Sequence, residues 1–413
     1  MSRNPYAYLT IVMSMLVYVC LDTFFYTMHP HRYFSGFDDL GYIVTAQNIV
    51  LHHMILFLGD TKPSVYVMPG YPLWIAGFYE LFGTGRYALW MVRTSQMFMM
   101  IGSALLIYRL AKKYFGLRIG VLAFEACLFL PDFVLTPLFL YTESLFILLS
   151  TATFYIATLL YEQPTKKRMV IFAVLLGLSL LVRPTIAIFP AVFLLWLAIS
   201  RRIRWKIFFA YAGIGVVLCS LMLVPWWIRN ENLYHTFIPF TASSGNPLLY
   251  GTFPIGYSTK FPAKEPTFIV ITTREKHLFA KKLPSLYARD QADRQMAIRN
   301  FHYEWHKNPL RVIASYTIGK FINFYTTMDW FGSFPRITRI QLILLHWTFL
   351  FFAVIALIKH RKVAFVQVFF LYAISTQIVY QVYLSMARYA LPVEFLLTPF
   401  AALTLVRLLK AVY

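Results

Sequence analysis

The chain has 413 residues, of which 59% are hydrophobic, 18% aromatic and only 13% charged. A soluble chain of this length needs a polar exterior, so the composition excludes an ordinary soluble domain and indicates a polytopic membrane protein. The formal net charge is +21. Nucleic acid is nevertheless not an expected partner, because the basic residues are spread between apolar segments and do not form one basic face. Such residues suit cytoplasmic loops and phosphate groups at a membrane surface.

Apolar segments recur along the whole chain. A membrane-spanning helix needs about 20 mainly apolar residues. The sequence predicts about ten such spans in a single all-α transmembrane domain over 1–413, at 7–27, 87–108, 118–136, 138–160, 168–182, 184–200, 206–228, 338–358, 363–384 and 389–409.

The short basic connections predict the orientation of these spans. Clusters of Lys and Arg fall in 109–118, 166–168, 201–206 and 359–362. These clusters recur at alternate connections and so lie on one side of the membrane, which is predicted to be the cytoplasmic side. We therefore expect both termini inside and an integral plasma-membrane protein. The compact chain favours a bacterial membrane.

Two segments are too polar to span, and both are expected outside. The first, 28–86, contains the adjacent acids Asp38 and Asp39, and its stretch 39–54 has the periodicity of an amphipathic helix. The second, 229–337, is mixed in charge and is predicted to hold a small helical subdomain, for instance over 285–307.

The Asp38-Asp39 pair is the most informative feature of the chain. Carboxylates next to hydrocarbon are costly and usually mark a functional site, here for proton abstraction or cation binding. An alternative is that the pair caps the helix over 39–54, because acids suit helix N-termini. Adjacent side chains on a helix diverge by about 100°, so both face one site only from a cap or a turn.

Six short motifs follow one another in chain order: Asp38-Asp39 with Tyr42 and Ala46 downstream, Pro69-Gly70-Tyr71-Pro72-Leu73, Tyr141-Thr142-Glu143-Ser144-Leu145-Phe146, Leu181-Val182-Arg183-Pro184-Thr185, Pro225-Trp226-Trp227-Ile228-Arg229-Asn230 and Arg388-Tyr389-Ala390-Leu391-Pro392. Together they resemble signatures of the GT-C glycosyltransferases. The pattern is most similar to the protein O-mannosyltransferase and lipid A aminoarabinose transferase branch, although Asp39 stands where that branch commonly has Glu. A large carboxy-terminal soluble domain, as in some members, is not expected.

The resemblance implies transfer of a sugar from a polyprenyl-phosphate carrier to a hydroxyl of a glycan, lipid or protein acceptor. Asp38 matches the first acid of the family motif and is the expected general base. Asp39 would position the site or bind a divalent cation, and no cofactor is otherwise expected.

Further residues of the motifs are expected to bind the substrates. Arg183, Arg229 and Arg388 lie at expected outer boundaries, where arginine suits a lipid phosphate; the alternative is that they anchor span ends by snorkelling. Glu143 is expected at the rim of the site or, alternatively, as an acid that favours a helix start. Tyr42 and Tyr389 complete the expected substrate-binding set.

The main rival function is a transporter or flippase of lipid-linked saccharides. Transporters place ionisable residues near the membrane midplane and use inverted repeats and broken helices. The conspicuous charges of this chain lie at expected outer boundaries and no internal repeat is evident, which favours the enzyme. A third possibility is a scaffold that keeps the fold without activity, and the presence of Asp38 argues against it.

Overall fold

The computed structural model describes residues 5–28, 38–58, 60, 62–253, 285–326 and 336–412. Every regular element in these ranges is a helix. The helices of the amino-terminal half are α1 (Pro5–Met28), α2 (Asp38–His52), α3 (Gly70–Phe82), α4 (Arg86–Phe115), α5 (Leu117–Phe129), α6 (Pro131–Leu135), η1 (Thr136–Leu138), α7 (Glu143–Glu162), α8 (Lys166–Val182), η2 (Pro184–Ala187) and α9 (Ile188–Ile199). Those that follow are α10 (Trp205–Tyr234), α11 (Gly245–Gly251), α14 (Leu286–Lys307), α15 (Pro309–Ala314), η4 (Ser315–Gly319), α16 (Lys320–Phe324), α17 (Arg336–Lys359), α18 (Ala364–Val382) and α19 (Ala387–Val412).

Six of these helices are long and apolar enough to cross a membrane, namely α1, α7, α10, α17, α18 and α19. The segments Leu117–Phe129 and Pro131–Leu138 form a pair bent by 53°, which makes a seventh if it is one broken span. Each of the expected segments contains a helix, but the expected number of about ten spans is not confirmed by length and composition. The helices α8 and α9, with 17 and 12 residues, are short.

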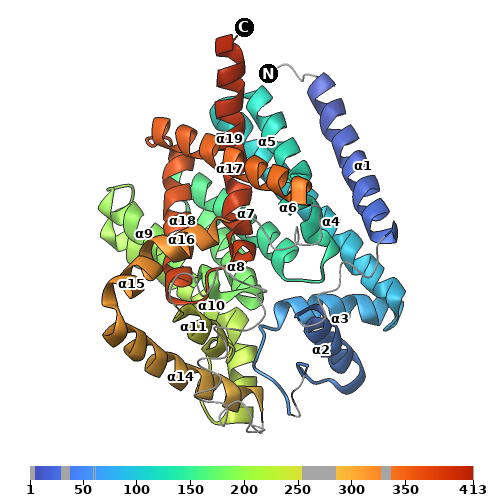
Figure 1. Ribbon diagram of the computed structural model, residues 1–413, viewed down its shortest axis with the longest axis vertical. Coiled ribbons are helices and arrows are strands. Elements are labelled where there is room, and N and C mark those ends of the chain that lie inside the picture. Colours follow the sequence, from blue (N-terminus) through green and yellow to red (C-terminus); the bar gives the residue numbers. More distant parts are fainter. Residues whose placement is uncertain are drawn as a thin grey trace.

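The last helix, α19, lies at the centre of the bundle. It contacts α5, α7, α17 and α18, and Figure 1 shows it running along the long axis of the molecule. Residues Ala390, Leu391, Val393, Phe395 and Phe400 on this helix are fully buried. A helix that is apolar around its whole circumference is stable only when it is enclosed, so α19 forms the core against which other spans pack.

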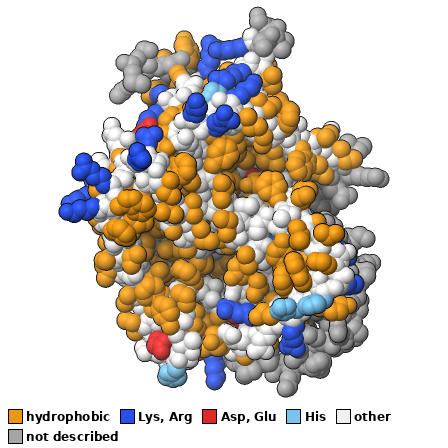
Figure 2. Space-filling view, turned by 90° about the vertical axis from the view of Figure 1, so that its left-hand side faces the viewer, with side chains coloured by type: hydrophobic (Ala, Val, Ile, Leu, Met, Phe, Trp, Pro, Cys, Tyr) orange, Lys and Arg blue, Asp and Glu red, His pale blue; other side chains and the backbone are white. Residues whose placement is uncertain are grey.

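The outer surface of the bundle is apolar. Large hydrophobic side chains on the spans are exposed, among them Leu9, Val216, Leu221 and Phe351, each more than half accessible. Figure 2 shows hydrophobic side chains over most of one face, with Lys and Arg gathered towards its upper end. Water would penalise an apolar surface of this extent, and lipid would not. The chain is therefore an integral membrane protein of the all-helical class.

The helices α2, α3, α11 and α14 lie at the end of the bundle opposite to the two termini (Figure 1). The predicted helices over 39–54 and 285–307 are confirmed as α2 and α14. The helix α3 was not expected. It packs on α8 with Gly70 so close that an added Cβ would lie 2.6 Å from the carbonyl oxygen of Leu181. Within the two expected outer segments, residues 29–37, 59, 61, 254–284 and 327–335 lie outside the described residues.

Candidate active site

The first acid of α2 meets the first turn of α19. Asp38 begins α2, where an acid is favourable because of the exposed N–H groups and the helix dipole. Nη2 of Arg388 donates to Oδ2 of Asp38 over 2.8 Å. The Asp38 side chain is 36% exposed and that of Arg388 is 20% exposed. Asp38 is thus a partly exposed carboxylate that is paired with a cation.

A buried carboxylate connects Arg388 to a second arginine. Oε1 of Glu143 lies 2.6 Å from Nη2 of Arg183 and 3.1 Å from Nε of Arg388. Glu143 begins α7 and only 1% of its side chain is exposed. The cap residue Thr142 makes no side-chain bond to its own helix; its hydroxyl accepts from Nε of Arg183 over 2.6 Å. Thr142 and Glu143, at the start of α7, therefore fix the guanidinium of Arg183 in place.

The position of Arg183 follows from the proline after it. The helical conformation is disfavoured for a residue that precedes proline, so α8 ends at Val182 and Arg183 is extended, with φ −145° and ψ 118°. Its guanidinium lies 5.6 Å from the ring centres of Phe146 and Tyr389. Nη1 of Arg183 is buried and donates to no group among the described residues. This atom is an unused, charge-carrying donor in the cluster.

Aromatic rings enclose the two guanidinium groups. Arg388 lies 4.8 Å from the ring centre of Tyr141. Tyr389 stacks on Tyr380 of α18, with ring centres 4.8 Å apart and planes at 14°. Planar guanidinium groups stack well on such rings. Tyr380 was not anticipated from the sequence, because a tyrosine in an apolar helix is usually only a core residue.

Tyr42 lies beside the same charges. Its ring packs edge-on against Tyr71 at 5.0 Å. Burial raises the pKa of its phenol, and the charge of Asp38 adds to this, with Glu143 acting in the same sense and the two arginines against it. Tyr42 therefore stays a neutral hydroxyl near the cluster and is able to donate a hydrogen bond to a substrate oxygen.

Asp39 faces a different environment from Asp38. It is fully buried, its Oδ1 accepts from the backbone N–H of Leu40 over 3.0 Å, and its charge acts on Arg93. Arg93 is itself fixed by a bond from Nε to the carbonyl oxygen of Leu138 over 2.8 Å. The two acids thus diverge, as adjacent residues on a helix must. In the described part of the chain, Asp39 does not belong to a group of three or more potential metal ligands.

The structure places Arg229 outside this cluster. Near the end of α10, its Nη2 donates to the carbonyl oxygen of Ile55 over 3.3 Å, and its Nη1 to the side-chain oxygen of Asn230 over 3.0 Å. Its guanidinium stacks on Trp226 at 4.9 Å. The contacts found for Arg229 thus tie the segment after α2 to α10. Of the expected site residues, the structure brings together Asp38, Tyr42, Glu143, Arg183, Arg388 and Tyr389.

Part of the chain is similar to a family of membrane glycosyltransferases. Residues 62–228 match the family model described as dolichyl-phosphate-mannose-protein mannosyltransferase. The matched range contains α3 to α9 and most of α10, and with them Glu143 and Arg183. No curated protein matches the chain in sequence.

Solved structures share the fold at low sequence identity. The apo oligosaccharyltransferase of Archaeoglobus fulgidus has a TM-score of 0.58 at 13% identity, covering 100% of this chain and 51% of that one. AglB from Archaeoglobus fulgidus, in complex with an inhibitory peptide and a dolichol-phosphate, has a TM-score of 0.56 at 14% identity, covering 99% and 52%. ArnT from Cupriavidus metallidurans, bound to undecaprenyl phosphate, has a TM-score of 0.47 at 15% identity, covering 98% and 79%. This chain thus spans about half the length of the archaeal structures.

Proposed function

We propose that the protein is a glycosyltransferase that moves a sugar from a polyprenyl-phosphate carrier to an acceptor hydroxyl, with Asp38 as the general base. The observation that carries this proposal is the continuous chain of contacts from Asp38 through Arg388 and Glu143 to Arg183. It places one accessible carboxylate next to two arginines, which is the set of groups that such a transfer needs.

The reaction requires one base and cationic stabilisation. The acceptor oxygen attacks the anomeric carbon, its proton passes to the carboxylate of Asp38, and the bond from the anomeric carbon to the phosphate oxygen breaks. A positioned base contributes about 10²–10⁴-fold to such a step. The leaving polyprenyl phosphate is already a stable anion, so it needs cations and not a general acid. Direct displacement of this kind inverts the anomeric carbon.

The arginines are suited to the departing phosphate. Arg183 keeps a buried donor, Nη1, without a partner among the described residues, and a phosphate oxygen would satisfy it. Arg388 is shared between Asp38 and Glu143, so its charge lies between the base and the buried anchor. Because Glu143 is almost fully buried, we assign it the positioning of both guanidinium groups and not proton transfer.

The relatives support a lipid-phosphate donor. The matched family model is named for dolichyl-phosphate-mannose, and the AglB structure contains a dolichol-phosphate. We infer that the donor of this protein is likewise a sugar on a polyprenyl phosphate. A glycan, lipid or protein hydroxyl would be the acceptor.

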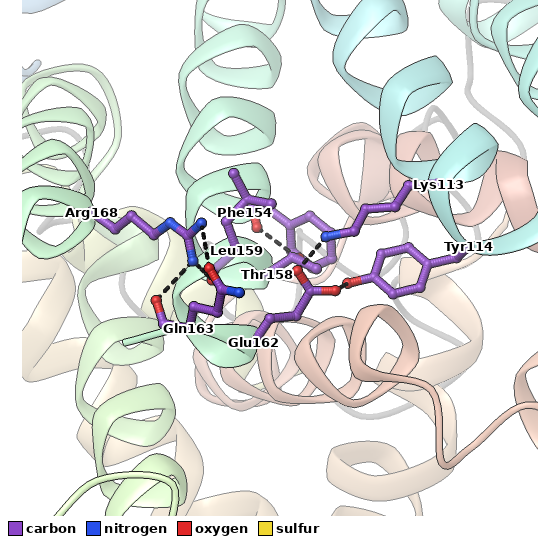
Figure 3. A network of polar contacts seen from close by, with 8 residues as sticks. All are labelled: Lys113, Tyr114, Phe154, Thr158, Leu159, Glu162, Gln163 and Arg168. Atoms are coloured by element: carbon purple, nitrogen blue, oxygen red, sulfur yellow. Dashed lines mark hydrogen bonds and ion pairs between the residues drawn. The ribbon is translucent and has the colours of Figure 1, made fainter. Parts of the chain in front are cut away.

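We infer an orientation with both termini in the cytoplasm of a bacterial cell and the site on the outer face. The polar network of Figure 3 lies at the opposite end of α7 from Glu143. It contains Lys113 and Arg168 around Glu162 and Gln163, and these cations belong to the basic clusters 109–118 and 166–168. An excess of Lys and Arg in short loops marks the cytoplasmic side.

One observation favours the alternative of a transporter or flippase for lipid-linked saccharides. The pair of α5 with α6 and η1 is bent by 53°, as in a broken span or a re-entrant loop, and broken spans are common in transporters. The two functions differ in the product, because only the enzyme releases free polyprenyl phosphate.

The test measures that product with purified protein in native-lipid vesicles, a panel of polyprenyl-phosphate sugars and crude cell-envelope acceptor. We expect release by the wild type and a loss of about 10²-fold or more in Asp38→Asn. The matched control is Glu80→Gln, an exposed acid on α3 of the same outer segment, which should keep full activity. Release that survives Asp38→Asn would remove Asp38 as the base. No release, together with movement of the donor across the bilayer, would establish the transporter.

A further inference from the structure

A second buried cluster of ionisable groups joins three helices away from the arginines. Asp132 of α6, His346 of α17 and Glu394 of α19 are 8%, 7% and 3% exposed. Each offers one potential ligand atom, and these atoms lie within 4.8 Å of one another. The proposed sugar transfer uses none of these three residues.

The carboxylates of this cluster carry buried oxygens that lack a hydrogen bond. Oδ1 of Asp132 and Oε1 of Glu394 accept no hydrogen bond among the described residues. Both line a small cavity of about 20 Å³, whose other walls include the apolar Leu342, Leu345 and Phe349. A cavity of about one probe sphere holds a single water or ion. A buried carboxylate oxygen that accepts no hydrogen bond is costly, so the cluster calls for a cation.

The histidine is oriented as a metal ligand would be. Its Nε2 lies 3.0 Å from the backbone carbonyl oxygen of Tyr325. A proton on Nε2 donated to this carbonyl leaves the lone pair on Nδ1, which lies 3.5 Å from Oδ2 of Asp132. Two ligands of a tetrahedral zinc ion, each about 2.0–2.2 Å from it, are about 3.4 Å apart. A carbonyl that fixes the other ring nitrogen is a common second partner of metal-bound histidines.

The charges in the cluster lead to the same conclusion. In the described part of the chain, the ion pairs of Asp132 and Glu394 run only to His346. With a neutral imidazole, two ionised carboxylates would leave a charge of −2 in an apolar setting. A divalent ion balances it, and one nitrogen with two carboxylate oxygens is a ligand set that suits Zn²⁺, with Mn²⁺ the next candidate.

We propose that Asp132, His346 and Glu394 form a structural site for a divalent transition-metal ion, Zn²⁺ in the first place. The ion fastens the bent segment after α5 to α17 and α19. Glu394 follows Arg388 by six residues on α19, so the ion lies about 9 Å along that helix from the arginine. The site therefore sets the position of α19 without contacting the substrates.

The test uses the full-length protein in detergent, stripped with a chelator and titrated with ZnCl₂ alone. We expect about one zinc ion per chain by elemental analysis, with a higher unfolding temperature when zinc is present. Glu394→Gln and His346→Gln should weaken zinc binding by about tenfold or more and should lose the thermal shift. Glu125→Gln is the matched control, because Glu125 lies on the adjoining α5 and bonds to Ser14 over 2.7 Å.

A wild-type protein that binds no zinc or manganese and melts at the same temperature with and without either ion would overturn the proposal. The cluster would then be a set of protonated acids, and Glu394→Gln should leave the unfolding temperature unchanged or raise it. Should the variants fail to fold, the stoichiometry and thermal shift of the wild type decide alone. None of these measurements depends on glycosyl transfer, so this proposal stands or falls separately from the proposed function.

Discussion

Nη2 of Arg388 lies 2.8 Å from Oδ2 of Asp38, although the two residues are 350 positions apart in the chain. The same guanidinium reaches Glu143 with its Nε. One side chain of the last helix thus connects α2 with the start of α7. This connection means that substitutions in three distant segments should affect a single site.

Removing the buried anchor should destabilise the protein strongly. Glu143→Gln leaves Arg183 and Arg388 without their shared buried carboxylate, and loss of one partner from a buried pair costs about 3–5 kcal/mol. The matched control is Glu162→Gln at the other end of α7, whose pair with Lys113 is exposed (Figure 3) and should contribute only about 0–1 kcal/mol. Thermal unfolding in detergent measures both, and similar shifts would contradict the anchoring role of Glu143.

The shape of the guanidinium group should matter at position 183. Arg183→Lys keeps the charge but loses the fork that reaches Thr142 and Glu143 together. Hydrogen bonds to charged groups contribute about 1.5–3 kcal/mol, so we expect KM for the polyprenyl-phosphate sugar to rise roughly ten- to a hundredfold. Arg86→Lys, at the exposed start of α4, should leave KM unchanged. An unchanged KM in Arg183→Lys would reduce Arg183 to an anchor of the helix end.

Substitution of alanine for each of two glycines of α3 should change the stability of the protein in opposite directions. Gly70→Ala brings a methyl group against the backbone of Leu181, where the nearest atom is 2.6 Å away, and overpacking typically costs about 1–3 kcal/mol. Gly77→Ala meets nothing within 4 Å and should stabilise the helix by about 0.5–1 kcal/mol. Unfolding temperatures compare the two directly. Because Leu181 is two residues before Arg183, Gly70→Ala should also lower transfer activity.

Asp293 of α14 should contribute a pH dependence of stability. Burial raises its pKa from 3.8 to about 6, opposed by Arg289 and assisted by Asp290. The folded state therefore holds this proton to a higher pH than the unfolded state, so its contribution to stability falls as the pH rises through the window between 3.8 and about 6. In Asp293→Asn, the unfolding temperature should depend less on pH over this window than it does in the wild type. A parallel profile in the variant would show that Asp293 titrates normally.

Much of the helical framework was predictable from the sequence. The helices over 39–54 and 285–307 were expected from periodicity and are α2 and α14. Apolar length located the helices of the bundle, but the number of spans depends on packing, because short helices such as α9 and the bent α5–α6 pair cross or turn according to their neighbours. The helix α3 was missed because its Pro-Gly-Tyr-Pro motif masks a helix start, where proline is well tolerated.

The charge cluster was only partly predictable. The motifs predicted Asp38, Glu143, Arg183 and Arg388 as site residues, and the structure brings these residues together, yet the motifs did not indicate that Glu143 lies between the two arginines. They also placed Arg229 in the site, whereas α10 turns that side chain towards Ile55. The grouping of Asp132 with His346 and Glu394 had no local signature at all, because its members come from three separate helices.

The late position of Arg388 has a consequence for the synthesis of the protein. Glu143 and Arg183 are only 40 residues apart, so this pair is able to form soon after α8 leaves the ribosome. Asp38 has to wait for a partner made 350 residues later, which is roughly 20–70 s at ordinary rates of translation. Under the proposed function, the growing chain has a base without its cation throughout that interval, so we expect an incomplete copy not to cleave the lipid donor. We therefore expect activity to begin only after the final helix is inserted.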